Sequence, residues 1–290
     1  MAAFIFGLGF SAAASAHCLG QGDDPVNVLG TVRTPGKADR LTERYQKVLV
    51  FDGTRPGLAV GAALQSGISH VIQSIPPDEA GDPVLRHHRA DLDAAGELEW
   101  LCYYSTIGVY GDFSGGWADE SAPLVPRNMR SDRRVLAEAA WRAYAKERGV
   151  PLCILRLAGI YGPGRSAFDK LRAGTARRLV KPGQVFNRIH VADIGRVTAL
   201  AAATRLAGTF NLADDEPAPP QDVVTHAAAL LGVAPPPETA FETAELTPMQ
   251  RSFYRDNKRV ANHAIKQALG IELLYPSYRD GLAAIHEEEK

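Results

Sequence analysis

Short apolar runs that alternate with helix-length segments are the feature of this sequence that most restricts its fold. The runs are almost continuously apolar through the first 160 residues, as are strands that are covered on both faces of a parallel sheet. The stretch Ser131–Arg148 carries apolar residues at helical spacing. This βαβα order predicts an α/β fold with a doubly wound parallel sheet. We expect strands at Ala3–Phe6, Val26–Gly30, Val48–Phe51, His70–Ser74, Leu98–Tyr104 and Leu152–Leu157.

The pattern changes after Leu157. A glycine-rich loop is expected at Gly159–Ser166, and prolines punctuate the last third of the chain. We therefore predict a Rossmann-type domain over residues 1–158, with sheet contributions from residues 185–213, and a smaller α/β lobe over residues 159–290. Helices are expected there at Ala192–Thr204, Asp222–Leu231 and Lys258–Leu269, and strands at Val185–Ile189 and Thr209–Leu212.

Composition excludes several classes of partner. The formal net charge is −1, from 32 basic and 33 acidic residues, which favours neither nucleic acid nor an anionic membrane. No run approaches the roughly 20 apolar residues that a membrane span needs. The apolar stretch Met1–Ala16 lacks a basic flank and is broken by glycines. We interpret it as the first strand and turn of the fold, not as a signal peptide, and expect a cytoplasmic protein.

The first predicted strand leads into a glycine turn and then into a helix rich in small residues. Gly7 permits the tight turn, and Gly9 lets the backbone approach a pyrophosphate. Phe10 and Ser11 open the helix, whose N-terminal N–H groups favour phosphate. Ala12 stands at the third glycine of the usual G-x-G-x-x-G pattern. This arrangement predicts a dinucleotide site.

The residues after the next strands indicate which dinucleotide binds. An acidic residue after the second strand would hydrogen-bond the adenosine ribose and indicate NAD, but Arg33 stands in this region. Arg33 can pair with a 2′-phosphate, so we favour NADP and keep NAD as possible; a solvated surface arginine is the alternative. Asp52 can meet the adenine amino group or simply form a turn. Ser74, which ends the fourth predicted strand, completes the expected cofactor site.

Five segments resemble, in order, the motifs of extended short-chain dehydrogenase/reductases, the NAD-dependent epimerase/dehydratase group. One contains the strand end S-T-I-G-V-Y-G, which resembles "SS-x-x-VYG", and another contains R-L-A-G-I-Y-G-P-G, which resembles "R-x-x-N-V-Y-G-P-G". The third contains R-I-H-V-A-D-I, which resembles "F-I-H-V-D-D-V". The matching segments are Leu101–Gly111, Trp117–Pro126, Leu155–Arg165, Arg188–Ile194 and Phe210–Glu216.

The resemblance implies particular catalytic residues, two of which are replaced. In that family a serine or threonine at the strand end orients a substrate oxygen, and Ser105 and Thr106 match it. A tyrosine four residues before a lysine carries the proton. Counting back from Glu138, which matches a family glutamate, puts Arg134 at the lysine position and Arg130 at the tyrosine position. Because arginine stays protonated, Arg130 cannot act as an acid/base. The chain therefore resembles an atypical member.

Other polar and aromatic residues near the same edge are candidates for the missing roles. Tyr110 and Tyr161 are the candidate acid/base groups, with a packing role as the alternative for each. Arg165, Asn187 and Arg188 stand where the family contacts nucleotide-sugar phosphates, with a surface role as the alternative.

Two functions follow from this pattern. The first is an NADP-dependent oxidoreductase or epimerase acting on a sugar, a nucleotide sugar or another small hydroxylated substrate. The second is a non-catalytic NADP-binding module that senses redox state, which the Arg130 and Arg134 replacements favour. No His/Cys/Asp cluster has metal-ligand spacing, so no metal is expected. The helix at Ser131–Arg148 can join a homodimer bundle, as in relatives, or face the core.

Overall fold

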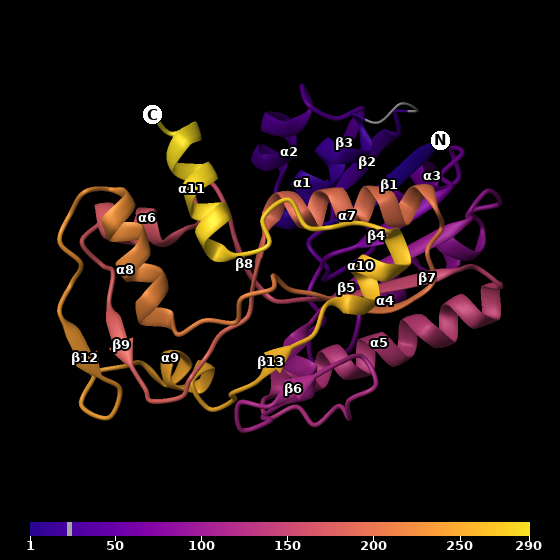
Figure 1. Ribbon diagram of the computed structural model, residues 1–290. Helices are drawn as coiled ribbons and strands as arrows, with labels where there is room; N and C mark the ends of the chain where they lie inside the picture. The colour runs from indigo at the N-terminus through magenta and orange to yellow at the C-terminus, as the bar shows by residue number, and fades with distance from the viewer. Residues whose placement is uncertain (22–24) are drawn as a thin grey trace. The chain divides into compact units, whose positions relative to one another are not determined.

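The apolar runs of the first 160 residues, together with β11 from later in the chain, form one seven-stranded sheet in the computed structural model, which describes residues 1–21 and 25–290. The strand order is β11-β7-β5-β4-β1-β2-β3 (Figure 1). This order confirms the predicted doubly wound, Rossmann-type parallel sheet, whose winding reverses between β1 and β4. The strands are β1 (Ala2–Phe6), β2 (Asn27–Val32), β3 (Lys47–Val50), β4 (His70–Gln73), β5 (Trp100–Thr106), β7 (Leu152–Leu157) and β11 (Gly208–Leu212).

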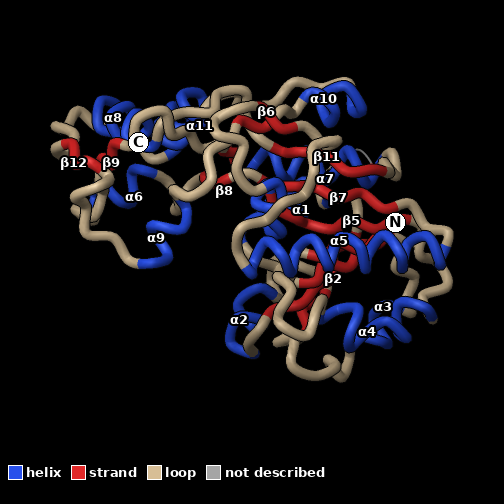
Figure 2. The backbone as a smooth tube through the Cα atoms, turned by 90° about the horizontal axis from the view of Figure 1, so that it is seen from below, coloured by secondary structure: helices blue, strands red, loops and turns tan. Residues whose placement is uncertain are grey.

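Helices cover this sheet on both faces (Figure 2). The longest, α5, begins after Asn128, whose side chain accepts a hydrogen bond from the Ser131 N–H, and ends before Gly149 at φ +65°. It confirms the helix predicted at Ser131–Arg148. The flanking helices are α1 (Phe10–Leu19), α2 (Pro35–Leu41), α3 (Val60–Leu64), α4 (Pro83–Asp93), α5 (Met129–Arg148) and α7 (Val191–Ala203).

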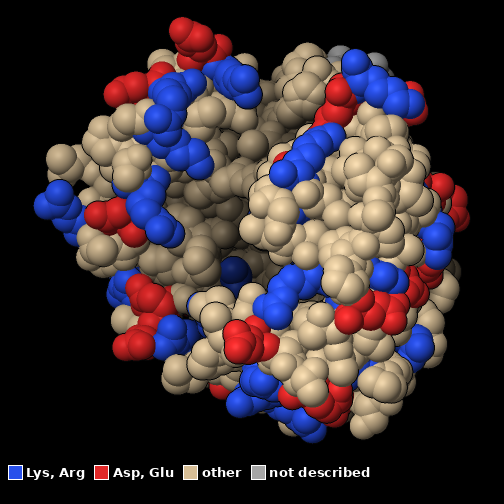
Figure 3. Space-filling model, turned by 90° about the vertical axis from the view of Figure 1, so that its left-hand side faces the viewer, with Lys and Arg blue, Asp and Glu red and all other residues tan. Residues whose placement is uncertain are grey.

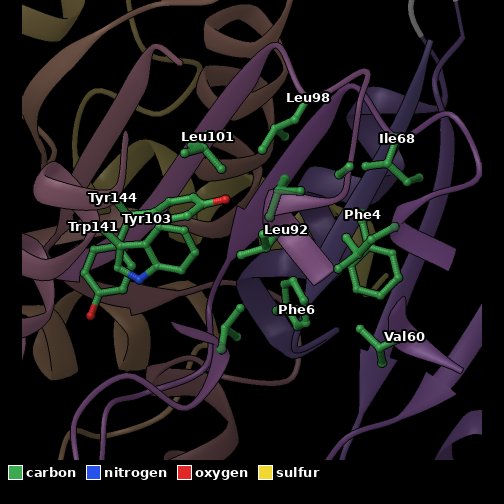
Figure 4. Close-up of a cluster of buried hydrophobic side chains, with 14 of the residues drawn as sticks. Phe4, Phe6, Val60, Ile68, Leu92, Leu98, Leu101, Tyr103, Trp141 and Tyr144 are labelled. Atoms are coloured by element: carbon green, nitrogen blue, oxygen red, sulfur yellow. The ribbon is translucent and has the colours of Figure 1, made fainter. Parts of the chain in front are cut away.

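Aromatic and aliphatic side chains from the sheet and its helices, α5 among them, form a large buried cluster (Figure 4). Trp141 of α5 stacks against Tyr103 of β5, with their ring centroids 6.2 Å apart, and contacts Tyr144 edge-on. Phe4 and Phe6 of β1 belong to the same cluster and are fully buried. The alternation of apolar strands and amphipathic helices therefore buries these side chains between the sheet and its helices.

The chain divides into two compact units that interleave along the sequence. Unit 1 holds the strands of the central sheet apart from the ends of β7 and β11, and unit 2 holds the smaller sheets. Unit 1 comprises Met1–Val109, Asn128–Arg156 and Ile194–Phe210. Unit 2 comprises Tyr110–Arg127, Leu157–Asp193 and Asn211–Lys290.

Unit 2 contains three two-stranded parallel ladders, in which β10 pairs with β8, β12 with β9, and β13 with β6. Its strands are β6 (Trp117–Ala118), β8 (Gly159–Tyr161), β9 (Arg178–Val180), β10 (Arg188–His190), β12 (Glu238–Ala240) and β13 (Arg259–Val260). Its helices are α6 (Ala167–Arg172), α8 (Pro220–Leu230), α9 (Pro248–Phe253), α10 (His263–Leu269) and α11 (Tyr278–Glu288), and the 3₁₀ turn η1 (Ile107–Tyr110) joins the two units along the chain.

Three predicted elements of the C-terminal half are wrong in detail. The strand expected at Val185–Ile189 is β10, which begins only at Arg188, where its pairing with Gly159 of β8 starts. The same pairing turns the start of the predicted glycine loop into a strand. The helix predicted at Lys258–Leu269 begins at His263, because Arg259 and the next residue pair with β6. In each case pairing with a distant segment overrides local propensity.

Charged side chains of both signs are interspersed on the face drawn in Figure 3, in keeping with the near-zero net charge. Among the described residues, no helix is both long enough and apolar enough to cross a membrane.

Candidate functional site

The glycine turn after β1 is held by hydrogen bonds from neighbouring strands. The Gly7 N–H donates to Thr31 Oγ1 at 3.0 Å, and the Ser74 hydroxyl donates to the Gly7 carbonyl at 2.7 Å. Gly7 has a φ of +87°, and a Cβ there would lie 2.9 Å from Ile75 Cγ1. Only glycine fits this backbone without strain. Ser74 thus supports the turn that was predicted to bind a dinucleotide.

Open space lies in front of Gly9, the residue that caps α1. Its backbone is extended, at φ −91° and ψ −165°. A Cβ built on Gly9 would meet just one described atom, the Gly7 carbonyl oxygen, at 3.9 Å. The backbone N–H groups of Phe10 and Ser11 follow in the first helical turn, where no intrahelical acceptor exists. This arrangement of residues fits the pyrophosphate of a dinucleotide.

The residues expected to determine whether NADP or NAD binds lie after β2 and β3. Arg33 directly follows β2 and is exposed. Lys37 of α2 donates to the Leu8 carbonyl at 2.8 Å, so its ammonium is already bound to the glycine turn. Asp52 is exposed and accepts hydrogen bonds from the backbone and hydroxyl of Thr54 at 2.9 and 2.7 Å. These bonds make an Asx turn and hold the pKa of Asp52 below its usual value.

The structure places Ser105 in a buried polar network. Its hydroxyl donates to Glu138 Oε1 at 2.6 Å, and Arg156 donates to the same carboxylate through Nε at 3.1 Å and Nη2 at 2.8 Å. Both Glu138 and Arg156 are almost fully buried. Burial acts to raise the pKa of Glu138, but the hydrogen bonds and charge of Arg156, with the Ser105 hydroxyl, hold it below its usual value. Because its hydroxyl proton is donated to Glu138, Ser105 can orient a substrate oxygen only by accepting a hydrogen bond or by giving up this one.

The two arginines at the family's tyrosine and lysine positions differ in their surroundings. Arg134 is half-buried and donates through Nη1 to the Tyr103 hydroxyl at 3.1 Å and to the Tyr104 carbonyl at 2.5 Å. Arg130 is exposed in the first turn of α5. Thr106, at the end of β5, accepts a hydrogen bond from the Gly108 N–H at 3.1 Å, which leaves its hydroxyl proton to be donated.

The candidate tyrosines of unit 2 are both buried. The Tyr110 hydroxyl donates to Asn211 Oδ1 at 2.6 Å, and its side chain is fully inaccessible. Tyr161 is 8% exposed, and its hydroxyl donates to the Ser277 carbonyl at 3.3 Å. Burial raises the pKa of Tyr161 far above its usual value. Both phenols therefore have structural hydrogen bonds that oppose proton transfer near neutral pH.

The three predicted substrate contacts of unit 2 lie in unlike surroundings. Asn187 is buried and joins β10 to β13, because it donates to the Lys258 carbonyl at 3.0 Å and accepts from the Val260 N–H at 2.8 Å. Arg165 is exposed. Arg188 is half-buried, and burial lowers its pKa. Asn187 therefore has an architectural role in this unit.

Sequence reasoning missed several polar residues that shape these sites. Thr31, which accepts from the glycine turn, stands in an apolar strand and gave no functional signal. The partnership of Glu138 with Arg156 was also missed, although an arginine inside the apolar run of β7 is an available signal. Among the described residues, no group of three or more His, Cys, Asp or Glu side chains can hold a metal ion.

Comparison with known proteins agrees with this geometry. The sequence model described as the NAD dependent epimerase/dehydratase family matches residues 90–213, which include β5, α5 and β10. A solved protein of unknown function from Silicibacter pomeroyi is 42% identical, covers 100% of this chain and 99% of its own, and superposes with a TM-score of 0.87. The central part of the chain, residues 90–213, is thus similar to that family.

Two further comparisons concern a curated enzyme and a solved structure. A curated 3-diazoavenalumate denitrifying reductase from a Streptomyces species is 32% identical over 140 residues. The match covers 44% of this chain and 45% of the reductase, so it spans less than half of that relative's length. The dTDP-glucose 4,6-dehydratase of Bacillus anthracis, solved with NAD, is 15% identical with a TM-score of 0.77 over 99% of this chain and 96% of its own. That likeness shows the fold alone.

Proposed function

We propose that this protein is an NADP-dependent oxidoreductase or epimerase that acts on a small hydroxylated substrate. The observation that carries the proposal is the open space at Gly9, next to the point where the winding of the sheet reverses. Open α/β sheets bind their ligands outside the carboxyl ends of the strands at such a point. The similarity to a reductase and the match of residues 90–213 to the epimerase/dehydratase model support hydride chemistry.

Unit 1 supplies the residues that would hold the dinucleotide. Gly7 and Gly9 would form the turn around the pyrophosphate, and the N–H groups of Phe10 and Ser11 would donate to it. Arg33 would pair with the 2′-phosphate of NADP, whereas NAD lacks that group. When bound, the nicotinamide gives or accepts a hydride.

A different donor must supply the proton in this protein. Tyr110 and Tyr161 are buried and hydrogen-bonded, and neither is a good acid/base at neutral pH. We therefore favour a bound water, with Thr106 donating its hydroxyl proton to orient the substrate oxygen. A sugar-like substrate is in keeping with the nucleotide sugar named for the dTDP-glucose dehydratase.

A second function is favoured by the two arginines. Arg134 already bonds to β5, and Arg130 cannot give or take a proton. A chain that keeps the dinucleotide site without these groups fits an NADP-binding redox sensor. Tight binding that differs between the oxidised and reduced dinucleotide, without turnover on any alcohol or sugar, would favour the sensor.

Replacing Arg33 by alanine is expected to weaken binding of NADP more than binding of NAD. The charge-assisted contact to the 2′-phosphate is worth about 1.5–3 kcal/mol, and NAD lacks its acceptor. Calorimetric titration of both dinucleotides measures the difference. The control is Arg44→Ala, which removes another exposed arginine of unit 1. Arg44 precedes β3 and so lies at the amino ends of the parallel strands, whereas Arg33 lies at their carboxyl ends. Equal losses for both dinucleotides would remove Arg33 from the cofactor site.

Restoring the family residues in an Arg130→Tyr, Arg134→Lys double variant tests the proposed chemistry. If the missing acid/base group limits hydride transfer, the variant should gain activity on a panel of alcohols and sugars, read at the nicotinamide absorbance. General acid–base catalysis contributes about 10²–10⁴-fold, so a gain of about tenfold is a conservative expectation.

The control for this variant keeps the tyrosine but not the lysine, as Arg130→Tyr alone. A slower double variant would show that the arginines belong to a working site of another kind. If the wild-type protein and the double variant both bind the dinucleotide but neither turns over any substrate, the redox sensor is favoured.

A further inference from the structure

A groove in unit 1 is lined by the last turns of α5 and by the segments that lead into β7 and β11. Its volume is about 520 Å³, which is in the range of sites for small molecules. Leu152, which lines it, begins β7, whereas the glycine turn follows the end of β1. In a parallel sheet these two positions lie at opposite edges. The groove is therefore separate from the proposed dinucleotide site.

Apolar side chains form the floor of this groove. Ile154 is 1% exposed and Ala145 is 5% exposed, and both belong to the large buried cluster of unit 1. Val150 and Leu152 are half-buried and pack against the same cluster. Together with Pro151 they leave an apolar surface at which the carbon chain of a ligand can exclude water.

Arg142 of α5 brings a partly exposed guanidinium to the groove. Its side chain is 43% exposed. Its Nη1 donates to Glu138 Oε2 at 3.2 Å, and its Nη2 donates to Thr209 Oγ1 at 2.6 Å. A guanidinium has five N–H groups, so these two bonds leave others to be donated to a ligand.

The charges around Arg142 do not balance. Glu138 is ionised, because its hydrogen bonds hold its pKa below the usual value, and it accepts from both Arg142 and the buried Arg156. The three side chains therefore carry one excess positive charge, and Arg142 is the exposed member. Lys146 also lines the groove, and its ammonium has no hydrogen-bond or ion-pair partner among the described residues. None of the described residues that line the groove is acidic, so its charge complements an anion.

The C-terminus of α5 determines where such an anion can lie. The free carbonyl groups at the end of a helix repel anions, and α5 ends before Gly149. Arg142 precedes Gly149 by seven residues, or about 10 Å along the helix axis. A ligand would therefore place its anion at Arg142 and its apolar part towards Val150 and Pro151.

We propose that this groove binds a monocarboxylate with an apolar chain, and that Arg142 pairs with its carboxylate. A guanidinium can donate two parallel hydrogen bonds to a carboxylate. Glu138 stays paired when Arg142 turns to the ligand, because Arg156 donates to both of its oxygens. The inference goes beyond the proposed function, since the groove needs neither a dinucleotide nor catalysis.

Binding of octanoate and octanamide tests the inference, because the two probes share a chain and a shape but differ in charge. Binding is followed by NMR of methyl groups, and the Val150, Leu152 and Ile154 resonances should shift with either probe. Octanoate should bind about three- to fivefold more tightly at low ionic strength, as expected for a partly exposed ion pair. Added salt should remove this preference, because it screens the charge of Arg142.

Two substitutions separate the charge of the groove from its apolar floor. Arg142→Gln should remove most of the preference for octanoate while octanamide binds as before. Ala207 is exposed and lines the groove. Ala207→Phe fills part of the apolar space but keeps the guanidinium, so it should weaken both probes by a similar factor.

Arg133→Gln is the matched control, because Arg133 lies on the same helix but outside the groove, where it pairs with Glu79. It should leave the affinity for both probes unchanged. Thermal unfolding verifies the fold of each variant. Arg142→Met provides a second neutral replacement if the glutamine variant does not fold.

Three results would overturn the inference. The first is equal affinity of the wild-type protein for octanoate and octanamide, or no binding of either. The second is an unchanged preference after Arg142 is replaced. The third is a set of shifted methyl resonances that lies outside the groove. Calorimetric titration with NADP on the same samples reports separately on the proposed function, because the glycine turn lies at the other edge of the sheet.

Discussion

Gly9→Val is expected to abolish dinucleotide binding while leaving the protein folded. The valine fits the free chain, because Gly9 has an extended backbone and a Cβ there meets just one described atom, at 3.9 Å. The same branched side chain would fill the space that a pyrophosphate needs. We expect a loss of at least about 100-fold in affinity, or about 2.7 kcal/mol, by calorimetry with NADP.

Gly96→Val is the matched control for this prediction. A Cβ at Gly96 likewise has room, because it meets no described atom within 4 Å, and the residue lies before β5, away from the glycine turn. Both variants should unfold near the wild-type temperature, and Gly96→Val should bind NADP normally. Gly7→Val makes a different comparison, since its φ of +87° makes a side chain strain the backbone itself. Normal NADP affinity in the Gly9 variant would contradict the cofactor site.

Glu138→Leu is expected to destabilise the protein by about 3–5 kcal/mol. The substitution removes the negative charge that balances Arg156 in the core and also the acceptor of the Ser105 hydroxyl. Urea unfolding at neutral pH measures the loss. Adding Arg156→Met should recover much of it, because a buried ion pair can often be replaced by apolar residues of similar size at little cost. A loss below about 1 kcal/mol would show that the network is not a major source of stability.

The control for Glu138 is an ion pair at the surface. Glu147 lies on the same helix and accepts from Arg89 at 2.6 Å, but its side chain is 66% exposed. Glu147→Leu should cost at most about 1 kcal/mol. The sign of the pH effect also distinguishes the buried carboxylate. The folded state lowers the pKa of Glu138, so its contribution is present above the unfolded pKa and is lost as the pH falls through the folded value.

The carboxyl edge of the sheet is held together by backbone hydrogen bonds in one place and by buried charges in another. The glycine turn is held mainly through backbone groups, with Thr31 and Ser74 as its side-chain supports. The end of β5 is held through buried charges, with Glu138 at their centre. We therefore expect a substitution at Gly9 to exclude a dinucleotide without unfolding the protein, and a substitution at Glu138 to lower its stability.

Local properties of the chain were enough to predict the sheet, the glycine turn and α5. Each depends on features that a short segment carries by itself. Apolar periodicity distinguishes a buried strand from an amphipathic helix, and Gly7 and Gly149 adopt positive φ angles that other residues avoid. Asn128 caps α5 through its own side chain. These preferences act within a few residues, so they can be predicted from the amino-acid sequence alone.

Only the tertiary structure decided which polar side chains are available for chemistry. Ser105 meets Glu138 across 33 positions of the chain, and Tyr110 meets Asn211 across 101. The pairing of β13 with β6 likewise replaces the first residues of a helix that local propensity predicted from Lys258. Residue type determines whether a side chain can donate, accept or carry charge. Its partner depends on which distant segments pack together and exclude water from it, and that arrangement is a property of the whole fold.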